Sequence, residues 1–305
     1  MENKTMNKRI YGIIGIKSVM ANWNADFSGY PRTTTENETF GTDKALKYPM
    51  KKMWQNNGEK IIYIKTLKPD NLCPCSLKQR YTTLFKEEPK DSIKVITNLF
   101  KATDVKNFGA TFAQTKLNIS ITGAVQIAQG FNKYDNTNPQ VMDIDCPFLT
   151  NEGDLQTTIG KKIVSNEAHY AYHFAINPDA YTEYVEMGVT EGYTEEDYEK
   201  FKKAALTSAT SFNTNSKVGC ENELAVFVET DKNTYLPDLA QYVFFKKSDD
   251  ENEKDTIELK FDSILNDVKD KIQTVEIYYN PYTTNIVADI NGAKMMNIFT
   301  QDEVK

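Results

Sequence analysis

The chain has 305 residues and a net charge of −7, and 40% of its residues are hydrophobic and 26% charged. This length and composition are typical of a globular protein that buries a sizeable core as one elaborated domain. No apolar run is long enough to cross a membrane, and residues 1–20 lack the apolar core of a secretory signal, so we expect a cytoplasmic protein without a membrane partner.

The first part of the chain predicts strands and helices joined by long polar loops. Residues Arg9–Met20 are rich in β-branched side chains and almost continuously apolar, which predicts a central strand. The polar segment Ala21–Phe40 follows, and loops of this length are usually functional or disordered. Thr42 is placed to cap a helix over Asp43–Gln55. The other elements predicted here are a strand at Ile61–Lys65, a short helix at Ser76–Phe85 and a helix at Asp91–Lys101.

The rest of the chain predicts further strands and one long helix. Apolar and polar residues alternate at the start of Asn118–Gln126, which predicts a half-buried strand with a bend at Gly123. Residues 132–158 are polar, and we expect them not to continue the sheet. The other predicted elements are strands at Glu167–Phe174, Glu223–Thr230, Tyr242–Lys247 and Thr274–Tyr279, and a helix at Glu195–Ser208 capped by Thr194. This order predicts an α+β fold with a ferredoxin-like antiparallel sheet, the plan that RNA recognition motifs also use.

The sequence offers no catalytic centre. His169 and His173 are four residues apart, but they lie in an alternating segment, so we interpret them as structural residues of a strand and not as zinc ligands. The four cysteines are scattered, and Cys73-Pro-Cys75 lacks the spacing of a zinc or redox motif. We therefore expect reduced thiols, with a metal contact at that pair as the alternative. No phosphate-binding glycine loop, nucleophile elbow or carboxylate pair is convincing, and we expect no enzyme activity and no cofactor.

Basic and amide side chains instead form a pattern typical of phosphate binding. Residues 1–180 carry 23 Lys and Arg against 18 Asp and Glu, whereas residues 181–305 carry 13 against 25. This asymmetry favours one face for a polyanion and another for solvent or basic partners. Amides and lysines can hold phosphate oxygens without reading a sequence, although a solvated helix face explains the same lysines equally well. The candidate residues are Asn22, Trp23, Asn24, Arg32, Thr42, Lys44, Lys47, Lys51 and Lys52.

An ordered series of motifs extends over about half the length of the chain. It consists of Asn22-Trp23-Asn24, Thr42-Asp43-Lys44-Ala45-Leu46-Lys47, Phe108-Gly109-Ala110 with Gly123-Ala124-Val125-Gln126, Thr158-Ile159-Gly160-Lys161-Lys162 with His169-Tyr170-Ala171-Tyr172, and Gly192-Tyr193-Thr194-Glu195-Glu196-Asp197. The series resembles the CRISPR-associated Cas7 family, and most closely its type I-B form. That subunit polymerises along guide RNA and forms the backbone of the Cascade complex.

The resemblance implies a single elaborated domain. Its palm would be an RNA-recognition-motif core, with an inserted finger region at about residues 66–107 and a thumb hairpin at about residues 131–167. Subunits would stack into a filament along the guide RNA, and each thumb would fold over the RNA of its neighbour and kink out a nucleotide.

The resemblance also implies roles for residues beyond the first loop and helix. Lys161 and Lys162 would hold phosphates together with the lysines of the first helix. Gln126 would bond the RNA backbone or a ribose. Met142 and Phe148 would act as apolar wedges, since an apolar wedge separates stacked bases without preferring one of them.

The partners that the resemblance implies are crRNA, other copies of the chain and other Cascade subunits. These subunits are the repeat-handle cap, the large subunit and the processing endoribonuclease, while a helicase-nuclease would be an indirect partner. Target DNA would be read through base pairing by the guide.

Two alternatives to this function stay open. Relatives in type III complexes cleave target RNA with a metal and an Asp in the loop after the first strand, so Asp26 allows a metal-dependent endoribonuclease. The other alternative is a self-assembling structural protein without nucleic acid.

Overall fold

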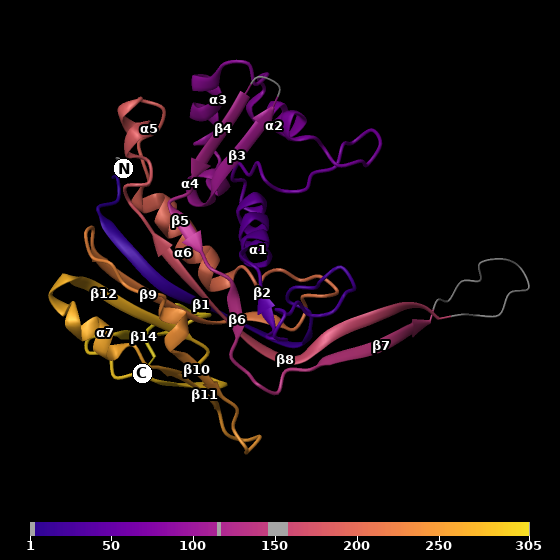
Figure 1. Ribbon diagram of the computed structural model, residues 1–305, viewed down its shortest axis with the longest axis vertical. Coiled ribbons are helices and arrows are strands. Elements are labelled where there is room, and N and C mark those ends of the chain that lie inside the picture. Colours follow the sequence, from indigo (N-terminus) through magenta and orange to yellow (C-terminus); the bar gives the residue numbers. More distant parts are fainter. Residues whose placement is uncertain (1–3, 115–116, 146–157, 305) are drawn as a thin grey trace, which may run out of the picture.

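The computed structural model describes residues 4–114, 117–145 and 158–304 of the chain. In this part of the chain the backbone forms a mixed α/β structure with sheets of nine, three and two strands, and antiparallel pairing dominates. The strand order of the large sheet is β14-β12-β9-β1-β8-β6-β2, and β5 and β7 also pair with β8. Figure 1 shows helices α1 to α4 above this sheet and the β7–β8 hairpin projecting away from the body.

The elements have the following bounds. The large sheet consists of β1 (Lys8–Ala21), β2 (Phe40–Gly41), β5 (Val125–Ile127), β6 (Gly130–Asn132), β7 (Pro139–Asp145), β8 (Thr158–Ile176), β9 (Cys220–Asp231), β12 (Ile272–Tyr279) and β14 (Lys294–Asn297). The small sheets consist of β3 (Gly109–Gln114) with β4 (Leu117–Thr122), and of β10 (Val243–Lys246), β11 (Asp255–Leu259) and β13 (Thr284–Val287). The helices are α1 (Asp43–Asn56), α2 (Leu77–Phe85), α3 (Ser92–Leu99), α4 (Thr103–Phe108), α5 (Thr182–Glu186), α6 (Glu195–Thr207) and α7 (Asp262–Asp267), with 3₁₀ turns η1 (Leu239–Tyr242) and η2 (Lys269–Lys271).

The predicted central strand β1 is confirmed, and it is almost fully buried because both faces of the large sheet are covered. Ile14 and Ile16 pack toward α1 and α6, whereas Tyr11 and Ile13 pack toward the sheet of β10, β11 and β13. Burial of each isoleucine contributes about 2 kcal/mol relative to leaving it exposed. A strand covered on both faces reads as a continuous apolar run, which is why this element could be predicted from sequence.

The predicted strand at Ile61–Lys65 is wrong. The backbone N–H groups of Ile62 and Tyr63 donate to the carboxylate of Asp104 at 3.0 and 2.8 Å, so a buried side chain replaces a neighbouring strand as acceptor. Ile61 and Ile62 are buried, which accounts for the apolar run that suggested a strand.

The predicted strand at Asn118–Gln126 is split into two strands of different sheets. β4 pairs with β3, whereas β5 pairs with β8, and the chain changes sheet at Gly123. Gly109 has a φ of +77°, and a Cβ atom there would lie 2.1 Å from the carbonyl oxygen of Ile121. A Cβ on Gly123 would lie 2.2 Å from the carbonyl carbon of Phe108. Both glycines therefore permit a close backbone crossing that any side chain would block.

β7 lies in the polar segment that we expected not to continue the sheet. All seven of its residues are exposed, so the strand has no buried face. Its partner β8 is a single strand of 19 residues that begins in the projecting hairpin and ends in the core. Among the described residues, no helix is long and apolar enough to cross a membrane.

His169 lies in a buried cluster of charged groups, in agreement with its structural interpretation. Its ring is 3% exposed, with Nδ1 2.8 Å from Glu223 Oε2 and Nε2 3.1 Å from Glu167 Oε1. Burial lowers the pKa of His169, but the two carboxylates outweigh this effect, so its pKa is raised. The hydrogen bond from His169 lowers the pKa of Glu167 to about 2. Phe245 of β10 stacks on the imidazole at 3.6 Å, so the cluster also joins β8 to the C-terminal sheet.

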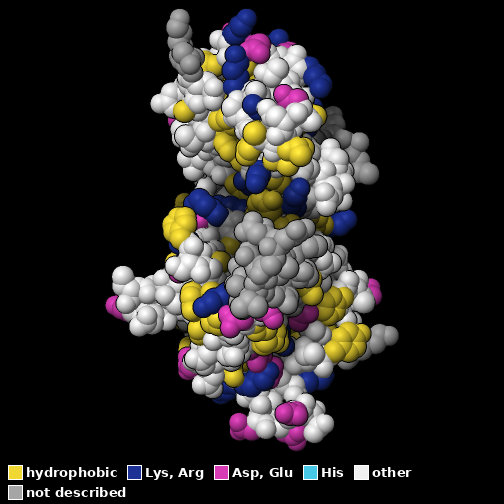
Figure 2. Space-filling view, turned by 90° about the vertical axis from the view of Figure 1, so that its right-hand side faces the viewer, with side chains coloured by type: hydrophobic (Ala, Val, Ile, Leu, Met, Phe, Trp, Pro, Cys, Tyr) yellow, Lys and Arg dark blue, Asp and Glu magenta, His cyan; other side chains and the backbone are white. Residues whose placement is uncertain are grey.

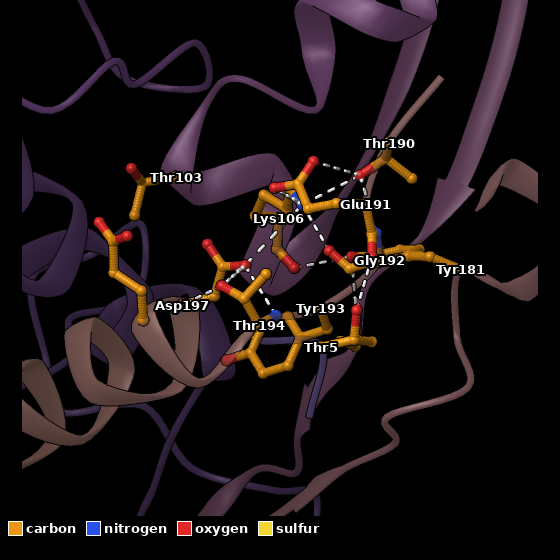
Figure 3. A network of polar contacts seen from close by, with 12 residues as sticks. Thr5, Thr103, Lys106, Tyr181, Thr190, Glu191, Gly192, Tyr193, Thr194 and Asp197 are labelled. Atoms are coloured by element: carbon orange, nitrogen blue, oxygen red, sulfur yellow. Dashed lines mark hydrogen bonds and ion pairs between the residues drawn. The ribbon is translucent and has the colours of Figure 1, made fainter. Parts of the chain in front are cut away.

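The segment Thr190–Asp197 contacts the side chain of Lys106 from α4 (Figure 3). The Lys106 ammonium group donates to Thr190 Oγ1 at 3.0 Å, to Glu191 Oε1 at 2.9 Å and to the Gly192 carbonyl. Its three donors are therefore all satisfied, although the residue is buried. This segment thus leads into α6 and also holds α4 in place through the hydrogen bonds that it accepts from Lys106.

Candidate nucleic-acid interface

A cleft of about 660 Å³ lies at the base of the β7–β8 hairpin. Its walls come from segments that are far apart in the sequence, namely the loop after β1, the middle of α1, the start of β8 and the loop between α6 and β9. The residues that give the cleft its chemical character are Asn22, Tyr30, Tyr48, Lys161, Lys162, Phe212 and Lys217. Lysines beside aromatic rings are a combination that binds single-stranded nucleic acid.

The asparagines of the loop after β1 hold this loop in place. Asn22 Nδ2 donates to the carbonyl groups of Gly29 at 2.9 Å and Ile163 at 3.1 Å, which joins the loop to β8. Asn24 Oδ1 accepts a hydrogen bond from the backbone N–H of Thr42 at 2.8 Å, and the Thr42 hydroxyl caps α1 as predicted. The amides that we predicted to meet phosphate thus position one wall of the cleft.

Asp26 closes a turn in the same loop. Its Oδ1 atom accepts hydrogen bonds from the backbone N–H groups of Ser28 at 2.8 Å and Tyr30 at 3.0 Å. Such a carboxylate-stabilised turn is a common use of Asp in loops. Within the described ranges, no three His, Cys, Asp or Glu side chains are grouped so that they could hold a metal ion.

Lys161 and Lys162 lie where β8 leaves the body of the protein. In the antiparallel register, Asp143 is opposite Lys161 and Met142 is opposite Lys162. Met142 is 37% exposed, so an apolar side chain lies beside a lysine on the surface of the hairpin. Phe148, the other predicted wedge, lies outside the described residues.

The lysines of α1 differ in their availability. Lys44 is almost fully exposed, with its ammonium group 3.7 Å from Asp43. Lys47 donates to the carboxylate of Asp43 at 2.9 Å, and Lys51 lies 4.0 Å from the buried carboxylate of Asp104. The charges of Lys47 and Lys51 are therefore compensated within the chain, and Lys44 is the more available to an external phosphate.

Other predicted contact residues lie elsewhere or are partly engaged. Trp23 is a core residue: it is 1% exposed and its indole N–H donates to the Tyr172 hydroxyl at 2.6 Å, so it cannot stack on a base in this conformation. Gln126 is exposed but donates its amide to a backbone carbonyl at 2.8 Å. Lys52 donates to a neighbouring glutamine on α1, and Arg32 is half-buried in the loop.

Sequence reasoning missed the aromatic residues of the cleft. Tyr30 and Tyr48 are 42% and 39% exposed, and the ring of Phe212 meets that of Tyr48 edge to face at 5.5 Å. The available signal was the presence of single aromatic residues within otherwise polar or lysine-rich segments. It is weak, because nothing in the sequence shows that these segments meet.

Sequence reasoning also missed Lys217. Its ammonium group donates to the carbonyl of Asn22 at 2.8 Å and to that of Trp23, and lies 5.0 Å from the centroid of a Trp23 ring. The backbone N–H of Asn22 donates to the Ser216 carbonyl at 2.9 Å, so the two loops are joined at adjacent positions. Burial lowers the pKa of Lys217 to about 8.

Charge is unevenly distributed on the face that bears the hairpin. Figure 2 shows Lys and Arg side chains in the upper part and around the narrow middle of this face, with a few in its lower part, whereas most of the visible Asp and Glu side chains lie in the lower part. A surface region with an excess of basic side chains attracts a polyanion.

The basic, aromatic cleft beside the projecting hairpin has the side chains with which proteins bind single-stranded nucleic acid. The sequence model of the family described as "CRISPR-associated protein Cas7" matches residues 8–263. This chain therefore belongs to the Cas7 family of CRISPR-associated proteins.

Solved structures resemble the chain in fold. A chain of a "CRISPR RNA-guided surveillance complex, pre-nicking" aligns with a TM-score of 0.58 and 14% identity, covering 95% of this chain and 97% of that one. A chain of a "CRISPR RNA-guided surveillance complex" aligns with a TM-score of 0.49 and 12% identity over 92% and 94%. No curated protein sequence matches.

Proposed function

We propose that this chain is a crRNA-binding backbone subunit of a type I CRISPR interference complex. It polymerises along the guide RNA and presents that RNA for pairing with target DNA. The observation that carries the proposal is the cleft at the base of the hairpin, which combines two lysines of β8 with the aromatic rings of three other segments. Membership of the Cas7 family and the shared fold support it.

The cleft supports binding that is sensitive to salt and tolerant of sequence. Lys44, Lys161 and Lys162 hold phosphate oxygens, while Tyr30 and Tyr48 offer faces on which bases stack. Met142 is exposed beside Lys162 and serves as a wedge between bases. The guide, and not the protein, then reads the target sequence.

The topology supports a ferredoxin-like palm. β9, β1, β8 and β5 lie side by side in that order and each is antiparallel to its neighbour, with α1 following β1 and α6 following β8 in the chain. We assign residues from about 66 to 107, with α2, α3 and most of α4, to the finger region, and residues from about 131 to 167 to the thumb.

The partners in this proposal are crRNA, further copies of the chain and other Cascade subunits, with type I-B as the subtype. The acidic second part of the chain faces away from the RNA or meets basic partner subunits. In this proposal Asp26 serves to stabilise a turn of the loop through its Oδ1 atom.

The test is to purify the protein after co-expression with a CRISPR array and to sequence any bound nucleic acid. The proposal predicts short RNAs of uniform spacer-plus-repeat length that are protected from nuclease along their length. Monomeric protein without RNA would overturn it, whereas intact filaments without RNA would establish the structural alternative.

A further inference from the structure

The ammonium group of Lys217 in the wall of the cleft faces backbone carbonyl groups and not a carboxylate. It donates to the consecutive carbonyls of Asn22 and Trp23, and in the described residues it forms no ion pair. Lys217 belongs to the loop that leads into β9, whereas Asn22 and Trp23 begin the loop that follows β1. One side chain therefore joins two walls of the cleft.

The contacts around Lys217 fix the first turn of the loop after β1. The backbone N–H of Asn22 bonds to the Ser216 carbonyl at 2.9 Å, and the Asn22 side chain bonds to Ile163 of β8 at 3.1 Å. Trp23 is anchored in the core through Tyr172. The Lys217 ammonium group is the only charged member of this set, and charge-assisted hydrogen bonds are about twice as strong as neutral ones.

We infer that Lys217 is a positioning residue for RNA: its ammonium group clamps the turn at Asn22 and Trp23, and so presents the wall of the cleft without contacting RNA itself. The inference rests on the proposed function and adds a mode of regulation to it. Loss of the Lys217 proton weakens the clamp, because the neutral amine loses the charge that strengthens its bonds to both carbonyls.

The relevant pH range follows from the surroundings of Lys217. Burial places its pKa near 8, so about a tenth of the chains keep the ammonium group at pH 9. Burial also raises the pKa of Cys220, its titratable neighbour at the start of β9, so that the thiol remains neutral over most of this range. The other titratable side chains that line the cleft are Tyr30 of the loop, Tyr48 of α1, and Lys161 and Lys162 of β8.

The experiment measures binding of fluorescent oligoadenylate by anisotropy between pH 7 and 9, where adenine does not titrate. Wild type is compared with Lys217→Met, which removes the charge, and with Lys217→Arg, which keeps it. Lys232→Met is the matched control, because Lys232 pairs with Asp179 outside the cleft and its loss changes the net charge equally. Binding is also measured as a function of salt at pH 7.

We expect wild type and the control to lose about fivefold in affinity from pH 7 to pH 9, because about a tenth of the chains keep the ammonium group at pH 9 and the neutral form binds about tenfold more weakly. The Met variant should bind about tenfold more weakly already at pH 7 and vary little with pH, whereas the Arg variant should stay tight at pH 9. Because Lys217 does not contact phosphate, the salt dependence of the Met variant should equal that of wild type. A slope reduced by about 0.7, the value for one phosphate contact on a single strand, would assign Lys217 a direct contact and overturn the inference.

Hydrogen exchange tests the clamp in the protein itself, independently of RNA binding. In the Met variant, the backbone N–H of Asn22 should exchange faster, while the strand amides of the core keep their protection. Equal binding by all variants, or an unchanged Asn22 amide, would overturn the inference alone. If neither wild type nor any variant bound RNA at any pH, the proposed function would be overturned, and the role of the clamp with it.

Discussion

The double substitution Lys161→Ala with Lys162→Ala tests the phosphate contacts of the cleft. Both side chains lie on the projecting part of β8, outside the two hydrophobic cores, so their removal should leave the fold intact. Each phosphate contact on a single strand contributes about 0.7 to the slope of log affinity against log salt, so two contacts contribute about 1.4. From about 0.05 M to 0.2 M salt, wild type should therefore lose about sevenfold more affinity than the variant.

Fluorescence anisotropy with oligoadenylate over this salt range is the assay, and circular dichroism verifies the fold of each variant. The matched control is Lys246→Ala with Lys260→Ala, which removes two lysines that pair with Glu258 on the C-terminal sheet. Its slope should equal that of wild type. An unchanged slope in the hairpin variant, or an equal decrease in the control, would show that the two lysines only add to the net charge.

Three further predictions concern residues that hold the structure together. His169→Gln should destabilise the protein by about 3 kcal/mol at pH 6, because the buried Glu223 loses its cation and Glu167 keeps only Lys247. In urea unfolding this difference should be fully present below about pH 6.5 and shrink as the pH rises through the raised pKa of His169. Gly109→Ala should cost about 2 kcal/mol or more in the same assay, since φ is +77° and the new Cβ would meet the carbonyl of Ile121. Trp23→Phe should cost about 1–2 kcal/mol by leaving the buried Tyr172 hydroxyl with one partner fewer, and should leave RNA affinity unchanged at equal folded fraction; a specific loss of affinity would place the indole in the interface.

Much of the fold could be predicted where burial produces a local pattern. β1 is covered on both faces and reads as an apolar run, and α6 begins with Thr194 and Asp197 in a reciprocal capping box. The prediction of a strand at Ile61–Lys65 is wrong because the partner of this segment is distant in the sequence. Its buried apolar side chains belong to an irregular segment whose amides bond to Asp104, 41 and 42 residues away, and no local pattern can reveal that partner.

The candidate site could be predicted only in fragments. Asn22, Lys161 and Lys162 were found through motifs and do line one cleft. Trp23 was assigned to the RNA because it lies in a polar loop, but the chain turns back there and buries the indole against Tyr172. The aromatic residues and Lys217 belong to no motif in their own segments. They line one cleft only because the fold brings the loops after β1 and α6 next to β8.

The position of the hairpin lysines depends on the core of the sheet. β8 is one continuous strand, and Ser165 is the point where it leaves the body, since it pairs with both Ala21 of β1 and Pro139 of β7. Lys161 and Lys162 therefore lie within four residues of the anchored part of the strand, and a strand positions side chains more accurately than a loop does. A slip of one residue between β1 and β8 would turn every side chain of β8 to the opposite face of the sheet. The register that buries Tyr170, Tyr172 and Phe174 on one face thus also decides which way each lysine of the hairpin points.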